Sequence, residues 1–506
     1  MAVVRRREVV AAPAGGGSVS SGRVNEAAAV AASEVDAWAS ETDVLVVGFG
    51  AAGASTAIEA ARAGARVDAI EAAGGWGGAT AMSGGEIYLG GGTTLQKSCG
   101  VEDTPEAMLA FLTAATGPGV DEAKLALYCE QSAEHYDWLV GCGVTFEAKV
   151  WNEPAWEAPT GYGLMYTGGE NAHPFNGIAQ PAPRGHIVHM ADKKPGERSA
   201  GWALLDNLVR TAENAGARVR YNTRAVRLVV DGGRVVGAEV ATFGERSFVR
   251  ARTGVVLCAG GFAANATMLS GNAPSLLGQH LVGTDGDDGR AIRMGQSVGA
   301  AVRHMDAGQV AFPSDPALIH RSLLLNRHGH RFINEDTYAG RIGQASLFTQ
   351  GGQAFLLYDE RAGDEARATM GYHVQPTWVS DDLAELAREM GIAPGVLEAT
   401  VEQYDIGAAK GEDPQHHKVA RWLRPLTAPY GVLDLRHAPS GVFTLGGLHT
   451  STDGEVLTPD RTPVPGLFAA GRTTNGIPSR GYCSGTSLGD GTFFGRRAGR
   501  AAARGK

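Results

Sequence analysis

The sequence feature that most constrains the fold is a glycine motif between a predicted strand and a predicted helix. The apolar run Val44-Leu45-Val46-Val47 is followed by GFGAAG at residues 48–53 and then by Ala-rich residues that continue to Ala63. This GxGxxG spacing is typical of a strand–turn–helix unit whose backbone N–H groups approach a pyrophosphate at the positive end of the helix dipole. The motif predicts an α/β fold with a Rossmann-like domain. The cofactor-binding turn is predicted to comprise Gly48, Gly50, Ala51, Ala52 and Gly53.

An acidic residue ends the next predicted strand. Residues 66–71 form this strand, and Glu71 is its last residue. A carboxylate at this position can accept hydrogen bonds from ribose hydroxyls, and it disfavours a 2′-phosphate. Glu71 therefore strengthens the prediction of a dinucleotide site.

The segment that follows favours a flavin over a nicotinamide. Residues 74–85 read GGWGGATAMSGG, so the backbone can pass flat against a wide ring. Thr80 and Ser83 could hydrogen-bond the polar edge of an isoalloxazine ring. A flexible glycine loop would have a similar composition, and the preceding motif favours the interpretation as an FAD site. The predicted contacts are Ala79, Thr80, Ser83, Gly84 and Gly85.

Strand-to-glycine transitions recur later in the chain. Residues 254–258 form an apolar run that ends in Ala259-Gly260-Gly261, and residues 466–470 form another that ends at Gly471. The segment 485–491 then precedes a helix, whose N-terminus could face the flavin pyrimidine. These segments add Gly471 to the predicted cofactor site.

The order of these motifs predicts a split nucleotide domain. At 506 residues the chain is too long for a single core. Residues 276–434 have mixed patterning and no phosphate-type glycine motif, so we expect an inserted α+β substrate domain there. Residues 41–275 and 435–506 then form the two parts of the FAD-binding domain, and residues 1–40 are predicted to be a flexible arm.

The composition argues against several partners and sites. The chain has 45 basic and 54 acidic residues, which offers no basic surface for nucleic acid. No apolar run approaches the ~18 residues needed to span a bilayer. The five cysteines lack CxxC spacing, which disfavours a disulfide framework and fits a reducing cytoplasm. The histidines lack a supporting acidic or thiolate set, so we predict no metal site.

The motifs together resemble a known flavoprotein superfamily. The GxGxxG fingerprint, GGATAMSGG, Ile333-Asn334-Glu335 and PGLFAAG are similar to segments of the fumarate reductase and ketosteroid dehydrogenase flavoproteins, over about residues 40–500. A closer resemblance is to bacterial 3-ketosteroid Δ4-(5α)-dehydrogenases. It rests on GGENAHPFN (168–176), PAPRGH (181–186), EDTYAGRIGQ (335–344) and GYCSGTSLGDG (481–491).

The resemblance implies a noncovalent FAD. Relatives with covalent flavin use a histidine before the small-residue loop, and residues 71–85 contain none. The resemblance also places adenine near Val226, Ala259 and Gly260 beside the adenosine half, and the amides of Ser487 and Leu488 at the pyrimidine edge. One departure is Arg472, where many members of the superfamily have a glutamate that contacts the ribityl chain.

The resemblance further implies desaturation of a 3-ketosteroid at C4–C5. Flavin N5 takes a hydride from C5, and the α-proton leaves C4, which the neighbouring ketone makes acidic. It assigns Tyr482 to the C3 ketone, Ser484 to the C4 proton and Tyr338 to relaying that proton. Tyr482 and Ser484 are two residues apart, so their side chains can emerge on one side of an extended segment. An external electron acceptor is implied as well.

Three other functions compete with this one. A fumarate reductase-like enzyme that reduces an enoate needs arginines to clamp a carboxylate, and Arg480 is a candidate. A 3-ketosteroid Δ1-dehydrogenase would share the fold, although its C-terminal tyrosine is usually followed by Pro-Gly and not by Cys483-Ser484. A flavin-binding electron carrier would need no tyrosine-lined pocket.

Overall fold

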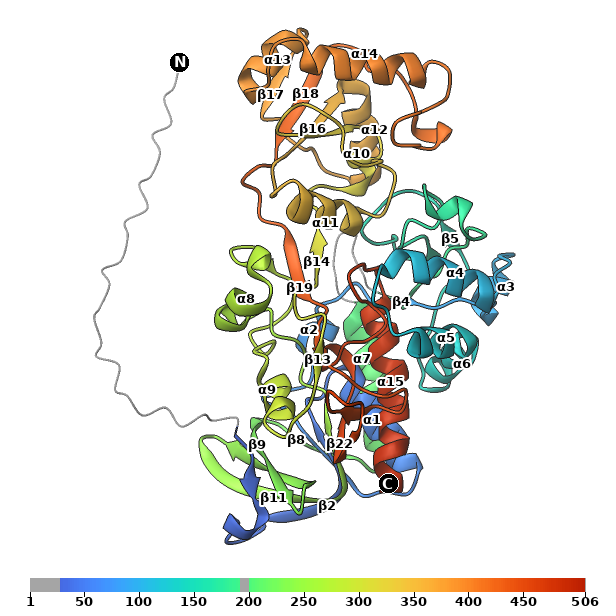
Figure 1. Cartoon of the computed structure of the whole chain (residues 1–506). Helices are drawn as coiled ribbons and strands as arrows, with labels where there is room; N and C mark the ends of the chain where they lie inside the picture. The colour runs from blue at the N-terminus through green and yellow to red at the C-terminus, as the bar shows by residue number, and fades with distance from the viewer. Residues whose placement is uncertain (1–27, 192–199, 506) are drawn as a thin grey trace, which may run out of the picture.

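The computed structural model describes residues 28–191 and 200–505, which form a mixed α/β fold built on a nine-stranded sheet (Figure 1). Most of the strand pairs around its centre are parallel, as in a Rossmann-like domain. These parallel strands are β2 (Ser40–Val47), β3 (Val67–Ile70), β8 (Arg218–Arg220), β11 (Glu245–Leu257) and β22 (Pro463–Ala469).

The predicted strand–turn–helix unit is confirmed. Residues 44–47 of β2 are buried between β3 and β11, and α1 (Ala51–Arg62) begins directly after the turn. Strands buried on both faces are expected to be continuously apolar, as this one is. The carboxyl ends of β2, β3 and β11 therefore meet at one edge of the sheet, next to the N-terminus of α1.

An antiparallel meander extends the sheet. β9 (Thr223–Asp231) and β10 (Arg234–Thr242) are joined by Gly232 and Gly233, both with positive φ, as in a tight β-hairpin. Of the predicted arm, residues 1–27 lie outside the described residues. The arm was predicted too long, because Val30 in β1 (Val30–Ala31) pairs with β9 and is buried.

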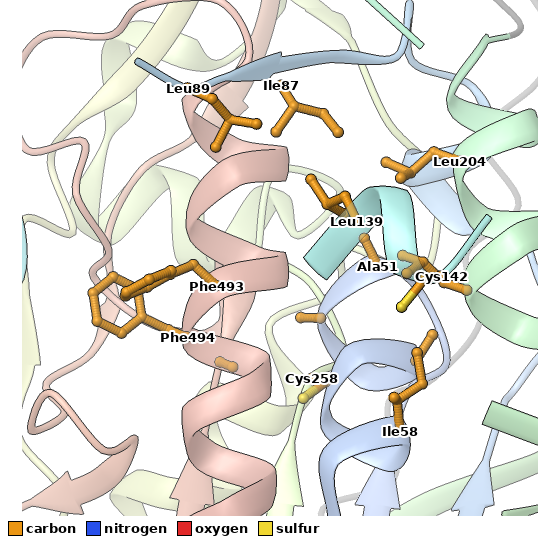
Figure 2. Close-up of a cluster of buried hydrophobic side chains, with 14 of the residues drawn as sticks. Ala51, Ile58, Ile87, Leu89, Leu139, Cys142, Leu204, Cys258, Phe493 and Phe494 are labelled. Carbon is orange, nitrogen blue, oxygen red and sulfur yellow. The ribbon is translucent and has the colours of Figure 1, made fainter. Parts of the chain in front are cut away.

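The C-terminal helix packs closely along α1. Figure 2 shows α15 (Thr486–Arg504) beside α1, with buried side chains of both helices between and around them. A Cβ atom on Gly495 would lie 2.5 Å from the Ala52 carbonyl oxygen, and one on Gly499 would lie 2.3 Å from that of Thr56. Glycines one turn apart therefore allow the two backbones to touch. The Thr56 hydroxyl uses this approach to donate to the Gly495 carbonyl (3.0 Å).

A small second sheet and several helices pack in the same hydrophobic core as α1 and α15. The sheet has the order β4-β7-β6-β5. Residues 122–141 form two consecutive helices that are interrupted at Gln131. The bounds are β4 (Glu86–Tyr88), β5 (Val150–Trp151), β6 (Leu164–Met165), β7 (Gly185–Ile187), α2 (Gly78–Ala81), α3 (Thr94–Ser98), α4 (Pro105–Thr116), α5 (Glu122–Glu130), α6 (Ser132–Gly141) and α7 (Ala200–Asn214).

A four-stranded antiparallel sheet with helices lies at the other end of the molecule from the large sheet (Figure 1). All its strands fall inside the predicted insertion, residues 276–434. Its elements are β15 (Leu323–Asn326), β16 (Ala354–Asp359), β17 (Trp378–Ser380), β18 (Tyr430–Asp434), α10 (Pro316–Ile319), α11 (Ala339–Thr349), α12 (Glu360–Met370), α13 (Leu383–Met390) and α14 (Val396–Ala408).

The chain connects the two ends through shorter elements. β14 (Gly308–Ala311) pairs with β19 (Gly441–Thr444), and α9 (Arg290–Gln296) packs in the same core as the large sheet. The predicted start of the insertion at residue 276 therefore falls among elements that pack with the large sheet. The remaining elements are α8 (Ala266–Asn272), β12 (His280–Leu281), β13 (Val302–Arg303), β20 (Gly447–Leu448) and β21 (Glu455–Leu457).

A buried ion cluster braces the four-stranded end. The Arg331 guanidinium donates to both carboxylate oxygens of Glu335 (2.8 and 2.7 Å) and to both of Asp413 (2.9 and 2.8 Å). The Lys418 ammonium lies 3.5 Å from Glu335. Burial alone would raise the pKa of Glu335, but the charges of Arg331 and Lys418 hold it at about 2. The glutamate of the Ile333-Asn334-Glu335 motif is therefore part of the structural core.

Candidate active site

One cavity of about 1220 Å³ extends from the carboxyl edge of the large sheet toward the four-stranded end. Single ligand pockets are usually about 300–1,000 Å³, so this one has room for a large cofactor and a second molecule. It brings together most of the residues predicted from the sequence. Those that line it are Gly48, Gly50, Ala51, Ala52, Glu71, Ala79, Thr80, Ser83, Gly84, Ala259, Gly260, Gly471, Ser487, Leu488, Tyr338, Tyr482 and Ser484.

The glycine turn is closed against neighbouring backbone. Gly48 has φ +93°, and a Cβ there would lie 2.6 Å from the Cys258 carbonyl oxygen. Gly53 does not line the cavity, because its Cα faces the Gly48 carbonyl oxygen, only 2.0 Å from where a Cβ would be. Gly53 therefore lets α1 pack on the turn, and Gly48 lets the turn pack against Cys258, while Gly48 and Gly50 line the cavity beside the helix N-terminus.

Thr80 lies at this helix N-terminus, whereas the sequence interpretation placed it at the polar edge of a flavin ring. Its hydroxyl accepts a hydrogen bond from the Ala51 N–H (3.1 Å). Ser83 donates to the Thr80 carbonyl (2.7 Å) and so holds the turn that presents Thr80. Gly85 does not line the cavity, because its Cα packs against Ala200 at the start of α7.

Glu71 is held at the adenosine side of the turn. One carboxylate oxygen accepts from the Phe49 N–H (2.9 Å) and the other from the Ala73 N–H (3.0 Å). Two backbone donors fix the carboxylate without using all its lone pairs, so it can still accept from a ribose. Val226 does not line the cavity. The three residues before it at the start of β9, Thr223, Arg224 and Ala225, do line it.

An ion pair that the sequence did not predict borders the same region. The Arg472 guanidinium donates to Asp287 (2.7 Å), whose other oxygen accepts from the Gly261 N–H (3.0 Å). Arg472 and Asp287 both line the cavity. In the sequence, Arg472 could be noticed because it stands where many members of the superfamily have a glutamate. Its partner Asp287 lies 185 residues away and belongs to no motif.

The reactive end is formed where the chain enters α15. The backbone of Ser484 is fixed by Thr167, which accepts from the Ser484 N–H (3.0 Å) and donates its hydroxyl to the Ser484 carbonyl (3.0 Å). The ring of Tyr482 packs edge-on against Phe443, with centroids 5.2 Å apart. Tyr338, at the N-cap of α11, packs in the same hydrophobic cluster as Tyr482 and Phe443.

The two phenols are in different hydrogen-bonding environments. The Tyr482 oxygen accepts a long hydrogen bond from the Ser487 N–H (3.5 Å) at the start of α15. Burial raises the pKa of Tyr482, and hydrogen bonds from Ser487 and Thr486 oppose the rise. Burial also raises the pKa of Tyr338 well above its usual range, and a hydrogen bond with Ser484 opposes that rise. Both phenols are therefore neutral near pH 7 and can donate.

Two neighbours of these tyrosines have no signal in the sequence. Gln309 on β14 donates from its side-chain amide to the Tyr338 oxygen (3.1 Å), and Phe443 on β19 supports Tyr482. Both lie outside every motif identified from the sequence. Only the pairing of β14 with β19 brings them to the site.

The far part of the cavity is mainly apolar. It is closed over by Trp156, whose indole N–H donates to the Ser314 carbonyl (3.1 Å). A wide neutral ring system suits such walls better than a charged molecule. The apolar lining here comprises Phe312, Pro313, Met370, Val374, Leu433 and Leu435.

Two other features are absent from residues 28–191 and 200–505. Within these ranges, His, Cys, Asp and Glu side chains form no group of three or more arranged to hold a metal ion. The same ranges contain no helix with the length and apolar character needed to cross a membrane.

Comparisons with known proteins agree with this geometry. The family model described as FAD binding domain matches residues 43–488. The structure of a 3-ketosteroid Δ4-(5α)-dehydrogenase from Rhodococcus jostii RHA1, in complex with 4-androstene-3,17-dione, is 52% identical with a TM-score of 0.92. It covers 94% of this chain and 99% of that chain.

More distant relatives include two of the chemistries considered from the sequence. The 3-oxo-5-alpha-steroid 4-dehydrogenase of Comamonas testosteroni is 27% identical over 519 residues, 88% of this chain and 96% of the relative. A probable fumarate reductase of Shewanella frigidimarina is 28% identical over 475 residues, 92% of this chain and 75% of the relative.

Proposed function

The chain belongs to the FAD-binding domain family, and from this premise we propose that it is an FAD-dependent dehydrogenase that desaturates a 3-ketosteroid between C4 and C5. The observation that carries the proposal is the placement of three hydroxyls. Tyr338, Tyr482 and Ser484 line one cavity, between a glycine-lined end and an apolar end. The 52% identical relative of known structure acts on this class of substrate.

The residues at the glycine-lined end fit FAD. Gly48 and Gly50 line the cavity at the N-terminus of α1 without side chains, and Glu71 is oriented by two backbone donors. We propose noncovalent binding through the predicted residues that line the cavity, with Ala225 in place of Val226. Bound FAD supplies the acceptor for the hydride that leaves C5.

Tyr482 is suited to polarise the C3 ketone. Its oxygen accepts from the Ser487 N–H, so its own proton is directed away from the helix N-terminus and can be donated. The amide at the positive end of α15 makes that proton a better donor. As the C4 proton leaves, negative charge develops on the ketone oxygen, and a preorganised donor stabilises it.

Ser484 and Tyr338 are suited to remove the C4 proton together. A serine hydroxyl is too weak a base to act alone, but once Tyr338 has given its own proton to solvent, its phenolate can accept the serine proton as the C4 proton arrives. The hydrogen bond between Tyr338 and Ser484 supports this relay. The backbone clamp from Thr167 keeps Ser484 in one position.

The fumarate reductase-like alternative is less well supported. Arg480, the arginine that kept it open, pairs with Asp306 (2.7 Å) with both side chains about half exposed, and it does not line the cavity. Two of the arginines that do line it, Arg290 and Arg472, pair with Asp288 and Asp287. The arginine that the sequence offered as a carboxylate clamp is therefore outside the cavity.

Anaerobic reduction of the bound flavin tests the proposal. We expect 5α-androstane-3,17-dione to bleach the flavin absorbance, and we expect fumarate not to reoxidise protein reduced with a dye. Rapid oxidation of 4-androstene-3,17-dione would instead identify a Δ1-dehydrogenase, because this steroid already has the C4–C5 double bond. Bound flavin that no steroid, enone or dicarboxylate reduces or reoxidises would indicate an electron carrier.

A further inference from the structure

A buried glutamine lies against the phenol of Tyr338. Gln309 is 3% exposed, lines the cavity and donates from Nε2 to the Tyr338 oxygen at 3.1 Å. Its other amide atom, Oε1, is buried and has no hydrogen-bond partner among the described residues. The only hydrogen bond that the structure records for this side chain is therefore the one to Tyr338.

The packing of α11 holds this pair in place. A Cβ on Gly340 would lie 2.3 Å from Gln309 Nε2 and 2.4 Å from Tyr338 Cε1. One turn later, a Cβ on Gly343 would lie 2.1 Å from the Val310 carbonyl oxygen. The two glycines let α11 lie directly on β14. This packing holds the Gln309 amide and the Tyr338 phenol next to each other.

The surroundings of Tyr338 oppose its ionisation. Burial raises its pKa most, and Tyr482, Cys483 and Glu86 raise it further. Ser484 and Gln309 are the neighbours that donate to its oxygen. A donor to an ionised oxygen is worth more than one to a neutral oxygen, so these two groups favour the phenolate over the phenol.

We propose that Gln309 is a positioning residue of the proton relay, which stabilises the phenolate of Tyr338 through its amide N–H. The inference rests on the proposed function. Tyr338 first loses its proton to solvent. Ser484 then accepts the C4 proton while passing its own to Tyr338, and the C4–H electron pair forms the C4=C5 bond as hydride leaves C5 to the acceptor. Gln309 itself neither gains nor loses a proton.

Two substitutions of Gln309 test this role. Gln309→Leu removes the donor, and Gln309→Glu keeps the shape but places an anion beside the phenol. We expect kcat to fall about 10- to 100-fold in Gln309→Leu and further in Gln309→Glu, because a hydrogen bond to a charged group is lost. KM is expected to change by less than about threefold, because the amide does not bind substrate.

The pH profile separates this role from a structural one. Below the pKa of Tyr338, log kcat of the parent enzyme should rise with pH. In Gln309→Leu, log kcat should rise with the same slope but be lower at each pH. A more acidic fluorotyrosine at position 338 should restore much of the loss in Gln309→Leu. The surface variant Gln350→Leu, whose amide only donates to Thr349 (3.0 Å), serves as the matched control.

Each outcome decides the question. An unchanged kcat in Gln309→Leu, or parental activity in Gln309→Glu, would overturn the inference, because the second result would mean that the side chain accepts from Tyr338. If Gln309→Leu lowers kcat equally with tyrosine and with fluorotyrosine at position 338, the inference is overturned as well. If Gln309→Leu does not retain flavin, the kcat of Gln309→Glu tests the inference. Failure of the parent enzyme to oxidise any 3-ketosteroid would instead reject the proposed function.

Discussion

At the scale of single residues, the two phenols differ in the group that donates to each oxygen. Tyr482 accepts from a backbone N–H at a helix N-terminus, and Tyr338 accepts from the side chain of Gln309. The backbone donor polarises Tyr482 as a hydrogen-bond donor to a ketone, whereas the donors around Tyr338 favour a phenolate. Two residues of the same type thereby acquire different roles.

Tyr482→Phe should slow the reaction strongly and leave the flavin in place. The variant loses the donor to the ketone oxygen but keeps the ring that packs on Phe443. We expect kcat to fall about 10²- to 10³-fold, as for the loss of one oxyanion donor. The rate of anaerobic flavin reduction by 5α-androstane-3,17-dione measures this, and the flavin-to-protein absorbance ratio is the control. An unchanged rate would reject the assignment of Tyr482.

Glu335→Gln should destabilise the four-stranded end. The buried Arg331 and Lys418 would lose a shared anion, at a cost of about 3–5 kcal/mol in the free energy of unfolding. Urea titration measures this. The exposed pair of Arg367 and Asp364 provides the control, because Asp364→Asn should change stability by less than about 1 kcal/mol. Equal effects of the two substitutions would contradict the structural role of the cluster.

The same cluster predicts an acid limit of stability. The pKa values of Glu335 and Asp413 are both lowered to about 2, from ordinary values of 4.5 and 3.8. A lowered pKa stabilises the folded state at pH values above the ordinary one, and the contribution is lost as the pH falls toward 2. The free energy of unfolding should therefore fall between about pH 5 and 2, and less steeply in Glu335→Gln.

At the scale of elements, the contact between α1 and α15 determines where two helix N-termini meet the cavity. α1 presents Ala51 and Ala52, and α15 presents Ser487 and Leu488. Gly495 and Gly499 let the helices approach until backbone touches backbone. A shift of either helix would move amide donors at both ends of the cofactor site.

Gly495→Ala should therefore destabilise the protein, although alanine normally favours a helix. The added Cβ would lie 2.5 Å from the Ala52 carbonyl oxygen, and we expect a loss of about 1–3 kcal/mol and weaker FAD binding. The control is Gly271→Ala in α8, where nothing lies within 4 Å and the change should be neutral or stabilising. Thermal melts and FAD titration compare them, and parallel behaviour of the two variants would disprove the packing argument.

At the scale of the whole molecule, the cavity is built from segments that are distant in sequence. Its walls include the glycine turn of residues 48–52, the loop of residues 154–160, β14 and the start of α15. A ligand in this cavity contacts both the large sheet and elements near the four-stranded end. Cofactor binding and folding should therefore be thermodynamically linked.

Removal of FAD should lower the stability of the whole chain. At a free FAD concentration 1,000 times Kd, binding would contribute about 4 kcal/mol. We expect the apoprotein to melt at a lower temperature and to recover on addition of FAD. Calorimetry with and without the cofactor measures this, with AMP as a ligand that covers only the adenosine side. Identical melting of the apoprotein and the holoenzyme would contradict the linkage.

The sequence by itself determined the features that depend on neighbouring residues. The strand at residues 44–47, the glycine turn, α1 and the hairpin at Gly232 follow from local backbone preferences and periodicity, so they could be predicted. The hydroxyls at positions 338, 482 and 484 were found through the family resemblance, and the cavity brings them together.

Tertiary structure alone decided which groups surround these residues. The contacts of Gln309 with Tyr338, of Phe443 with Tyr482 and of Asp287 with Arg472 join segments far apart in the chain. That Ala225 lines the cavity and Val226 does not depends on where the start of β9 meets the cavity. Such contacts arise from how sheets and helices pack, and the pattern of residues within one segment carries no record of its distant neighbours.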